Sequence, residues 1–426
     1  MKLHRFRIAN GIPGVVWPMP GVMSVCLAVG MSFGSRFETR DTNGMAHFLE
    51  HMAFKGGTDW PNSLAITSAV EGSGGKMNAF TGNDAMLYYV HVPSKNTPVA
   101  FSVLADMLIR PRFRTNDIEH ERGVVFEELR RALDDFDDLA DVAATALYFG
   151  DHPLGWEIVG PKENIQRFER QDFLRFFAQH YVAEHVFLAV AGNINPREAE
   201  RLAKQFSEMP KHGGTTPFPL PAPTLPPRSQ VRIVRKSESE QAHFRIVMRG
   251  PENDHPLRDA CSFATSVLSG GQSCRFSQTL RDKLGLVYDI GADSLSERDY
   301  GQVVIAGGAG AEKLSRALRA IRQELKQIGN HGVSQKEFAR VREMREGNIA
   351  LGAERSLGLA CYFATEMAHG REPLSPEKRI AENQKISRGD VKRAAQEFLK
   401  PDRMTTLAVV GNVQESEAEL LEIISK

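Results

Sequence analysis

Two histidines four residues apart, His47 and His51, form the clearest chemical pattern in the sequence, His-Phe-Leu-Glu-His. On a helix, positions i and i+4 lie one above the other, so both imidazoles can reach one metal ion. Glu50 stands three positions after His47, where its carboxylate can contact a metal-bound water without being a ligand. The pattern therefore indicates a metal centre on a helix, with a carboxylate beside the bound water.

The flanking residues favour a helix at this position. Residues 41–43, Asp-Thr-Asn, offer a capping side chain before it, and Gly56 and Gly57 are expected to stop it. The alternative is a surface helix that carries two unrelated histidines. With 13 histidines in the chain, a chance HxxEH is expected in roughly a few per cent of such sequences. The apolar neighbours Phe48 and Leu49 also argue against a merely solvated helix.

A catalytic zinc site usually has a third protein ligand and an open position for water. Glu121 and Glu128 are the best candidates, because two helical turns separate them and their side chains project from nearly one face. Glu127 points about 100° away from that face. One carboxylate could bind the metal while the other orients a histidine. Spacing alone, however, fits an ordinary charged helix better.

Several segments together resemble the pitrilysin and insulin-degrading-enzyme family of zinc peptidases, which includes the mitochondrial processing peptidases and short bacterial relatives. The inverted HxxEH is followed by Glu128 in the context Val-Val-Phe-Glu-Glu-Leu. Residues 44–56 are similar to the family's metal helix, residues 75–81 to its substrate strand, and residues 150–155 to a later loop. The resemblance covers nearly the whole chain.

The resemblance implies one zinc ion per chain, and it assigns roles that spacing left open. The implied zinc ligands are His47, His51 and Glu128. Glu50 is the implied catalytic base, and Glu121 the implied supporting carboxylate. The residues implied to pair with the substrate backbone are Asn78, Ala79, Phe80 and Thr81.

The second half of the chain carries Arg281-Asp-Lys-Leu-Gly-Leu-Val-Tyr288, which resembles the family's Arg and Tyr pair. The resemblance implies that Arg281 fixes the substrate main chain and that the phenol of Tyr288 helps to hold the oxyanion. From the residues alone, Tyr288 is better explained as a core aromatic. The second half has no HxxEH, so we expect metal only in the first half.

The chain divides at a proline-rich segment that holds seven of its 22 prolines and disfavours regular structure. We expect a domain at 1–209, a semi-rigid linker at 210–229 and a second domain at 230–426. The hexapeptides 188–193 and 407–412 match closely, and each follows a helical stretch and precedes an acidic helix. The halves therefore indicate duplication.

Strand-like runs alternate with long amphipathic helices in both halves, and their connections allow antiparallel pairing. We predict an α+β fold of two homologous domains, each a mostly antiparallel sheet packed with helices. By the resemblance, the chain forms half of a clamshell-type chamber.

Composition excludes several classes of protein. Lys plus Arg and Asp plus Glu number 53 each, so the formal net charge is zero, which argues against nucleic-acid binding. The four cysteines form no CxxC pair and suggest free thiols in a reducing compartment. No apolar run is long enough to span a bilayer, and the first residues do not resemble a signal peptide. We therefore expect a cytoplasmic location and no membrane partner.

These observations predict a zinc-dependent endopeptidase that hydrolyses extended or unfolded peptides. The expected partner is a second copy in a homodimer, or a close relative in a heterodimer, which completes the chamber. Two alternatives within the same family are a non-catalytic scaffold and a peptide-binding subunit.

Overall fold

The computed structural model describes residues 2–213 and 222–425, and it divides into two compact units. The first unit comprises Met1–Leu129, Glu157–Leu220 and Ile349–Arg379, and the second comprises Arg130–Trp156, Pro221–Asn348 and Ile380–Lys426. Residues 214–221 of the expected linker lie outside the described residues. Within the described ranges, no helix is both long and apolar enough to cross a membrane.

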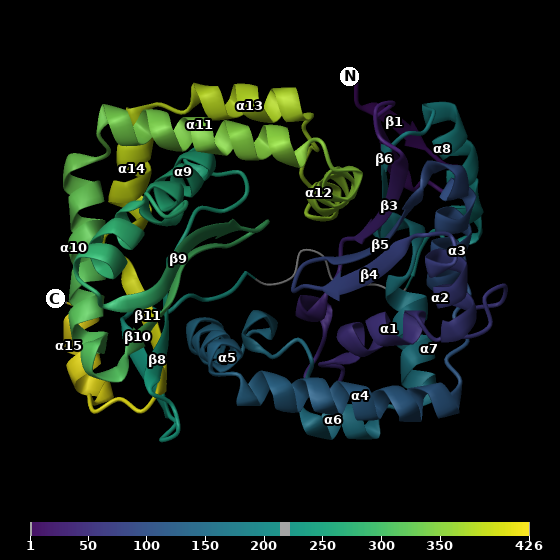
Figure 1. Cartoon of the computed structure of the whole chain (residues 1–426). Helices are drawn as coiled ribbons and strands as arrows, with labels where there is room; N and C mark the ends of the chain where they lie inside the picture. Colours follow the sequence, from purple (N-terminus) through teal and green to yellow (C-terminus); the bar gives the residue numbers. More distant parts are fainter. Residues whose placement is uncertain (1, 214–221, 426) are drawn as a thin grey trace. The chain divides into compact units, whose positions relative to one another are not determined.

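The first unit contains a six-stranded sheet (Figure 1). Its strands are β1 (His4–Arg7), β2 (Pro13–Pro18), β3 (Ser24–Met31), β4 (Lys76–Thr81), β5 (Met86–Pro93) and β6 (Val186–Gly192). Their order is β1-β2-β6-β3-β5-β4, and β2 with β6 is the parallel pair among antiparallel neighbours. Strand β4 therefore lies at an edge of this sheet.

The second unit contains a five-stranded sheet. Its strands are β7 (Gln230–Arg235), β8 (Gln241–Arg249), β9 (Val287–Ser296), β10 (Gly301–Gly310) and β11 (Met404–Gly411). Their order, β7-β11-β8-β10-β9, repeats the order β2-β6-β3-β5-β4, again with a parallel pair at β7 and β11. The prediction of an α+β fold built from two related sheets is confirmed. The repeated hexapeptides form the ends of β6 and β11 and the residue after each strand.

Fifteen α-helices pack around these sheets in the described residues. They are α1 (Met45–Ala53), α2 (Ser63–Glu71), α3 (Thr97–Ile109), α4 (Thr115–Asp134), α5 (Phe136–Phe149), α6 (Lys162–Arg167), α7 (Arg170–His180), α8 (Pro196–Ala203), α9 (Arg258–Ser269), α10 (Leu314–His331), α11 (Gln335–Gly352), α12 (Ser356–Ala368), α13 (Pro376–Lys385), α14 (Arg388–Phe398) and α15 (Glu417–Ser425).

The central strands of the first sheet are buried on both faces, as β3 illustrates. Its odd-numbered residues from Val25 to Val29 enter the main core of the first unit, whereas Cys26 and Ala28 face a smaller cluster with α12. The helix packs so closely on the strand that a Cβ atom on Gly30 would lie 2.5 Å from the Ala364 carbonyl oxygen. A strand buried on both faces has a continuous apolar sequence, as residues 25–31 do.

The compact units do not coincide with two continuous halves of the chain. Helix α12 follows most of the second half in sequence but packs on the first sheet. Helix α5 precedes the linker but packs on the second sheet, where Asp141 forms a bidentate ion pair with Arg245 at 2.6 and 2.9 Å. Each sheet thus needs a helix from the other half of the chain to bury its second apolar face.

Candidate metal centre

Helix α1 carries the HxxEH pattern, and a buried carboxylate holds its first turn. The side chain of Glu38 accepts hydrogen bonds from the backbone N–H groups of Gly44 at 2.9 Å and Ala46 at 2.6 Å. Asn43 donates its amide to the same carboxylate at 3.0 Å. The expectation that residues 41–43 supply the cap is therefore wrong, because the N-cap residue is Gly44 and a more distant glutamate satisfies the free N–H groups. Burial raises the pKa of Glu38 to about 8, although these donors oppose the shift.

The side chains of His47, His51 and Glu128 converge, as predicted. One oxygen of Glu128 lies 3.6 Å from Nε2 of His47 and 3.2 Å from Nε2 of His51. One ligand atom from each of the three residues falls within 4.8 Å of the other two. Two imidazole nitrogens and one carboxylate oxygen are a donor set that zinc uses at catalytic sites, where a fourth position stays open for water. The residues therefore fit a zinc ion.

The two histidines have opposite electrostatic environments. Burial lowers the pKa of His47 to about 4, and the neighbouring His51 adds to the effect, so the imidazole is neutral at pH 7. A neutral imidazole is the form that binds metal. Burial also lowers the pKa of His51, but the hydrogen bond to Glu121 and the charge of Glu128 outweigh it and raise that pKa overall.

Glu121 lies behind His51 and fixes its ring. The Nδ1–H group of His51 donates to one oxygen of Glu121 at 3.1 Å, which turns Nε2 toward Glu128. The other oxygen of Glu121 pairs with the ammonium group of Lys55. Burial raises the pKa of Glu121, but His51 and Lys55 outweigh it and lower that pKa. The carboxylate therefore stays ionised beside His51, an arrangement suited to orienting a metal-binding imidazole from behind.

Lys55 also belongs to this site, although its contact with Glu121 was not predicted from the sequence. The residue follows His51 by four positions, the same interval that separates the two histidines, so it continues their face of the chain just beyond the end of α1. This spacing in the sequence could have identified Lys55 as a neighbour of the histidines.

Glu50 lies outside the converging set and contacts strand β4 instead. The hydroxyl of Thr81 donates to a carboxylate oxygen of Glu50 at 2.6 Å. Burial raises the pKa of Glu50, and the hydrogen bond from Thr81 opposes part of the shift. A carboxylate held near the histidines without joining them is suited to a base. Thr81 itself, expected on the substrate strand, thus also contacts the candidate base.

Strand β4 carries the predicted substrate residues and has one open edge. It pairs with β5 on one side, where Asn78 lies opposite Tyr89 and Ala79 lies opposite Tyr88. Among the described strands, none pairs with its other side. Phe80 is 47% exposed although it is aromatic. An open edge beside a metal centre can accept an extended peptide through main-chain hydrogen bonds.

Arg281 and Tyr288 belong to the second unit. Arg281 lies in a π-helical segment, Ser277–Lys283, and donates to the side-chain carbonyl of Gln272 at 2.9 Å. Tyr288 lies on β9 and is 73% exposed, so the interpretation of this residue as a core aromatic is wrong. The catalytic role that the resemblance implies for the pair stays a prediction.

Comparison with known proteins agrees with these features. Residues 20–162 match the family described as "Insulinase (Peptidase family M16)", and residues 167–345 match "Peptidase M16 inactive domain". A Bacillus subtilis protein named "Uncharacterized zinc protease YmxG" is 31% identical over 352 residues, which cover 83% of this chain and 85% of that protein.

Two solved structures share the fold. A protease from Helicobacter pylori aligns with a TM-score of 0.86 and 22% identity, covering 96% of this chain and 99% of the other. The periplasmic protease PqqL from Escherichia coli aligns with a TM-score of 0.79 and 20% identity, covering 99% of this chain and 50% of PqqL. Both similarities lie at the level of the fold.

Proposed function

The chain belongs to the M16 family of peptidases, and on that premise we propose that it is a zinc-dependent endopeptidase. The observation that carries the proposal is the convergence of His47, His51 and Glu128, with Glu121 fixed behind His51. The resemblance found in the sequence and the name of the Bacillus relative support zinc as the metal.

Each residue of the site has a distinct part in the proposed hydrolysis. His47, His51 and Glu128 would hold the metal, which when bound supplies Lewis-acid chemistry at the scissile carbonyl and the attacking water. Glu50 takes the proton from that water and returns it to the leaving amine. Thr81 orients the carboxylate of Glu50 through its hydroxyl.

Substrate recognition is proposed to occur along β4. An extended peptide adds to the open edge at Asn78–Thr81, so that its backbone is recognised more than its side chains. A folded protein rarely offers a free extended segment, which favours unfolded peptides as substrates. Arg281 is proposed to hold the substrate main chain and Tyr288 the oxyanion.

A second subunit is proposed to complete the active chamber. The chain aligns with half the length of PqqL, which favours an assembly of two such chains. A homodimer is sufficient because one chain carries both the HxxEH helix and the Arg281/Tyr288 pair. We propose a cytoplasmic location, which the four free cysteines support.

A quenched, unstructured peptide tests the activity directly. The proposal predicts one zinc per chain, cleavage of the peptide, and loss of cleavage when a chelator removes the metal. A non-catalytic scaffold of the family would leave the peptide intact with zinc present. A peptide-binding subunit would bind the same peptide without cleaving it.

A further inference from the structure

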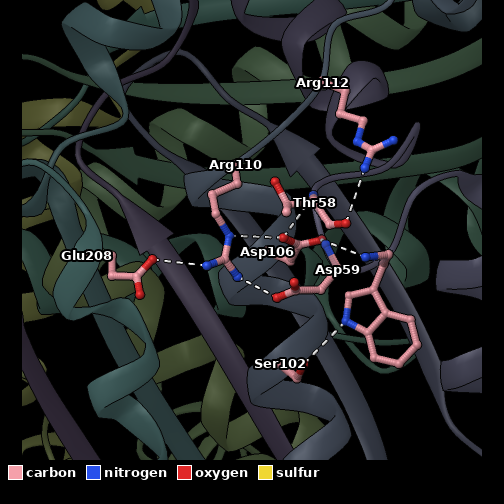
Figure 2. A network of polar contacts seen from close by, with 8 residues as sticks. Thr58, Asp59, Ser102, Asp106, Arg110, Arg112 and Glu208 are labelled. Atoms are coloured by element: carbon pink, nitrogen blue, oxygen red, sulfur yellow. Dashed lines mark hydrogen bonds and ion pairs between the residues drawn. The ribbon is translucent and has the colours of Figure 1, made fainter.

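A buried carboxylate on α3, that of Asp106, holds loop 56–60, which follows helix α1. The side chain of Asp106 is fully buried, with 0% of its surface exposed. It accepts hydrogen bonds from the backbone N–H groups of Thr58 at 3.1 Å, Asp59 at 3.0 Å and Trp60 at 2.8 Å. Figure 2 shows these contacts together with the Nε–H group of Arg110, which donates to the same carboxylate at 3.2 Å. Asp106 thus orders three successive peptide groups.

The loop is also fixed at its start. The Ser63 hydroxyl donates to the Phe54 carbonyl at 2.8 Å, and the backbone N–H of Arg112 donates to the Gly56 carbonyl at 3.1 Å. Gly57 packs directly against the buried carboxylate, since a Cβ atom there would lie 2.4 Å from Oδ2 of Asp106. A methyl group at Gly57 would therefore displace the loop or the carboxylate.

The loop begins directly after a residue that contacts the candidate metal centre. Lys55 is the residue before Gly56, and its ammonium group pairs with Glu121. The same carboxylate of Glu121 receives the Nδ1–H of His51 at 3.1 Å. A shift of the loop therefore reaches a metal ligand through two polar contacts.

We propose that Asp106 is a positioning residue of the metal centre. It fixes loop 56–60, the loop fixes Lys55, and Lys55 keeps Glu121 against His51. The inference rests on the proposed zinc site and extends it to a residue outside that site. The hydrogen bonds of the Asp106 carboxylate go to the loop and to Arg110. Loss of a group that hydrogen-bonds a metal ligand commonly weakens metal binding 10- to 100-fold, and we expect the lower end, about tenfold, for Asp106 because it acts through Lys55 and Glu121.

Zinc affinity of the whole chain, measured by competition with a chromophoric chelator, tests the inference without using activity. Asp106→Asn and Lys55→Met should each bind zinc about tenfold more weakly than the unchanged chain. The double variant should be no weaker than the weaker single variant, because both changes act on one series of contacts. Leu104→Ala is the matched control: it opens a cavity on the same helix at a residue 1% exposed and should leave zinc affinity unchanged.

The outcomes separate this inference from the proposed function. Unchanged zinc affinity in Asp106→Asn, or losses in the double variant that multiply, would overturn the positioning role while the zinc site stands. Absence of zinc binding by the unchanged chain would reject the proposed function and this inference with it. If Asp106→Asn does not fold, Gly57→Ala disturbs the same contact with the carboxylate intact, and unchanged zinc affinity there would overturn the inference.

Discussion

His180 should make the chain sensitive to acid. The residue ends α7, is 1% exposed, and its ring stacks on Phe33 with ring centroids 5.1 Å apart and lies 4.2 Å from the ring centroid of Phe176. Burial lowers its pKa from 6.5 to about 3, and the nearby His185 contributes to the shift. In the folded protein the His180 imidazole therefore stays neutral at pH values at which it is protonated in the unfolded chain.

The sign and size of the effect follow from proton linkage. Because the pKa of His180 is lower in the folded state, its contribution to the free energy of unfolding is complete above pH 6.5. This contribution is lost as the pH falls toward about 3. Between about pH 7.5 and about pH 5, protonation of the unfolded chain at this one residue removes about 2 kcal/mol from the free energy of unfolding.

Urea denaturation at several pH values measures this loss. His180→Phe retains an aromatic ring without a titrating nitrogen and should lose about 2 kcal/mol less than the unchanged chain over that pH range. His120→Phe, at an exposed position of α4, is the control and should keep the original pH dependence. An unchanged pH dependence in His180→Phe would show that His180 does not cause the loss of stability.

Three further predictions concern the site. Glu128→Gln should lower bound zinc, whereas Glu127→Gln should leave it nearly unchanged; metal analysis of both variants would contradict the assignment if the pattern were reversed. Thr81→Val should lower kcat about tenfold or more with zinc retained, because a hydrogen bond to a charged group contributes about 1.5–3 kcal/mol. Thr81→Ser keeps the hydroxyl and should restore kcat. An equal loss of kcat in both variants would argue against a role for the hydroxyl. We also predict that each active site is shared between two subunits, with Glu50 from one subunit and Arg281 and Tyr288 from the other. Random exchange of Glu50→Gln with Tyr288→Phe subunits should then restore about a quarter of all sites, and verified exchange without recovered activity would reject the shared site.

The sequence predicted the local part of the metal centre because that part depends on helical periodicity. Two histidines at i and i+4 must share a face, and the structure brings them together. Spacing could not choose between Glu121 and Glu128, since both project from one face of α4. Only the packing of α4 against α1 places Glu128 at the Nε2 atoms and Glu121 at Nδ1 of His51.

The supporting contacts could not be predicted because they join residues that do not share a helix or a strand. Glu38 caps α1 across a turn, Thr81 reaches Glu50 from another strand, and Asp106 reaches its loop from α3. No periodicity links such residues. The exchange of α5 and α12 between the two halves of the chain is similar, because only the apolar second face of each sheet determines where these helices pack.

In the proposed function, His47, His51 and Glu128 bind zinc while Glu50 performs proton transfer. Glu50→Gln tests it most directly, by metal analysis and turnover of a quenched peptide on the same preparation. Glu50→Gln should retain one zinc per chain and lose about 100- to 10,000-fold in turnover, since the ligands survive and the base does not. Turnover close to that of the unchanged chain, with zinc still bound, would contradict it.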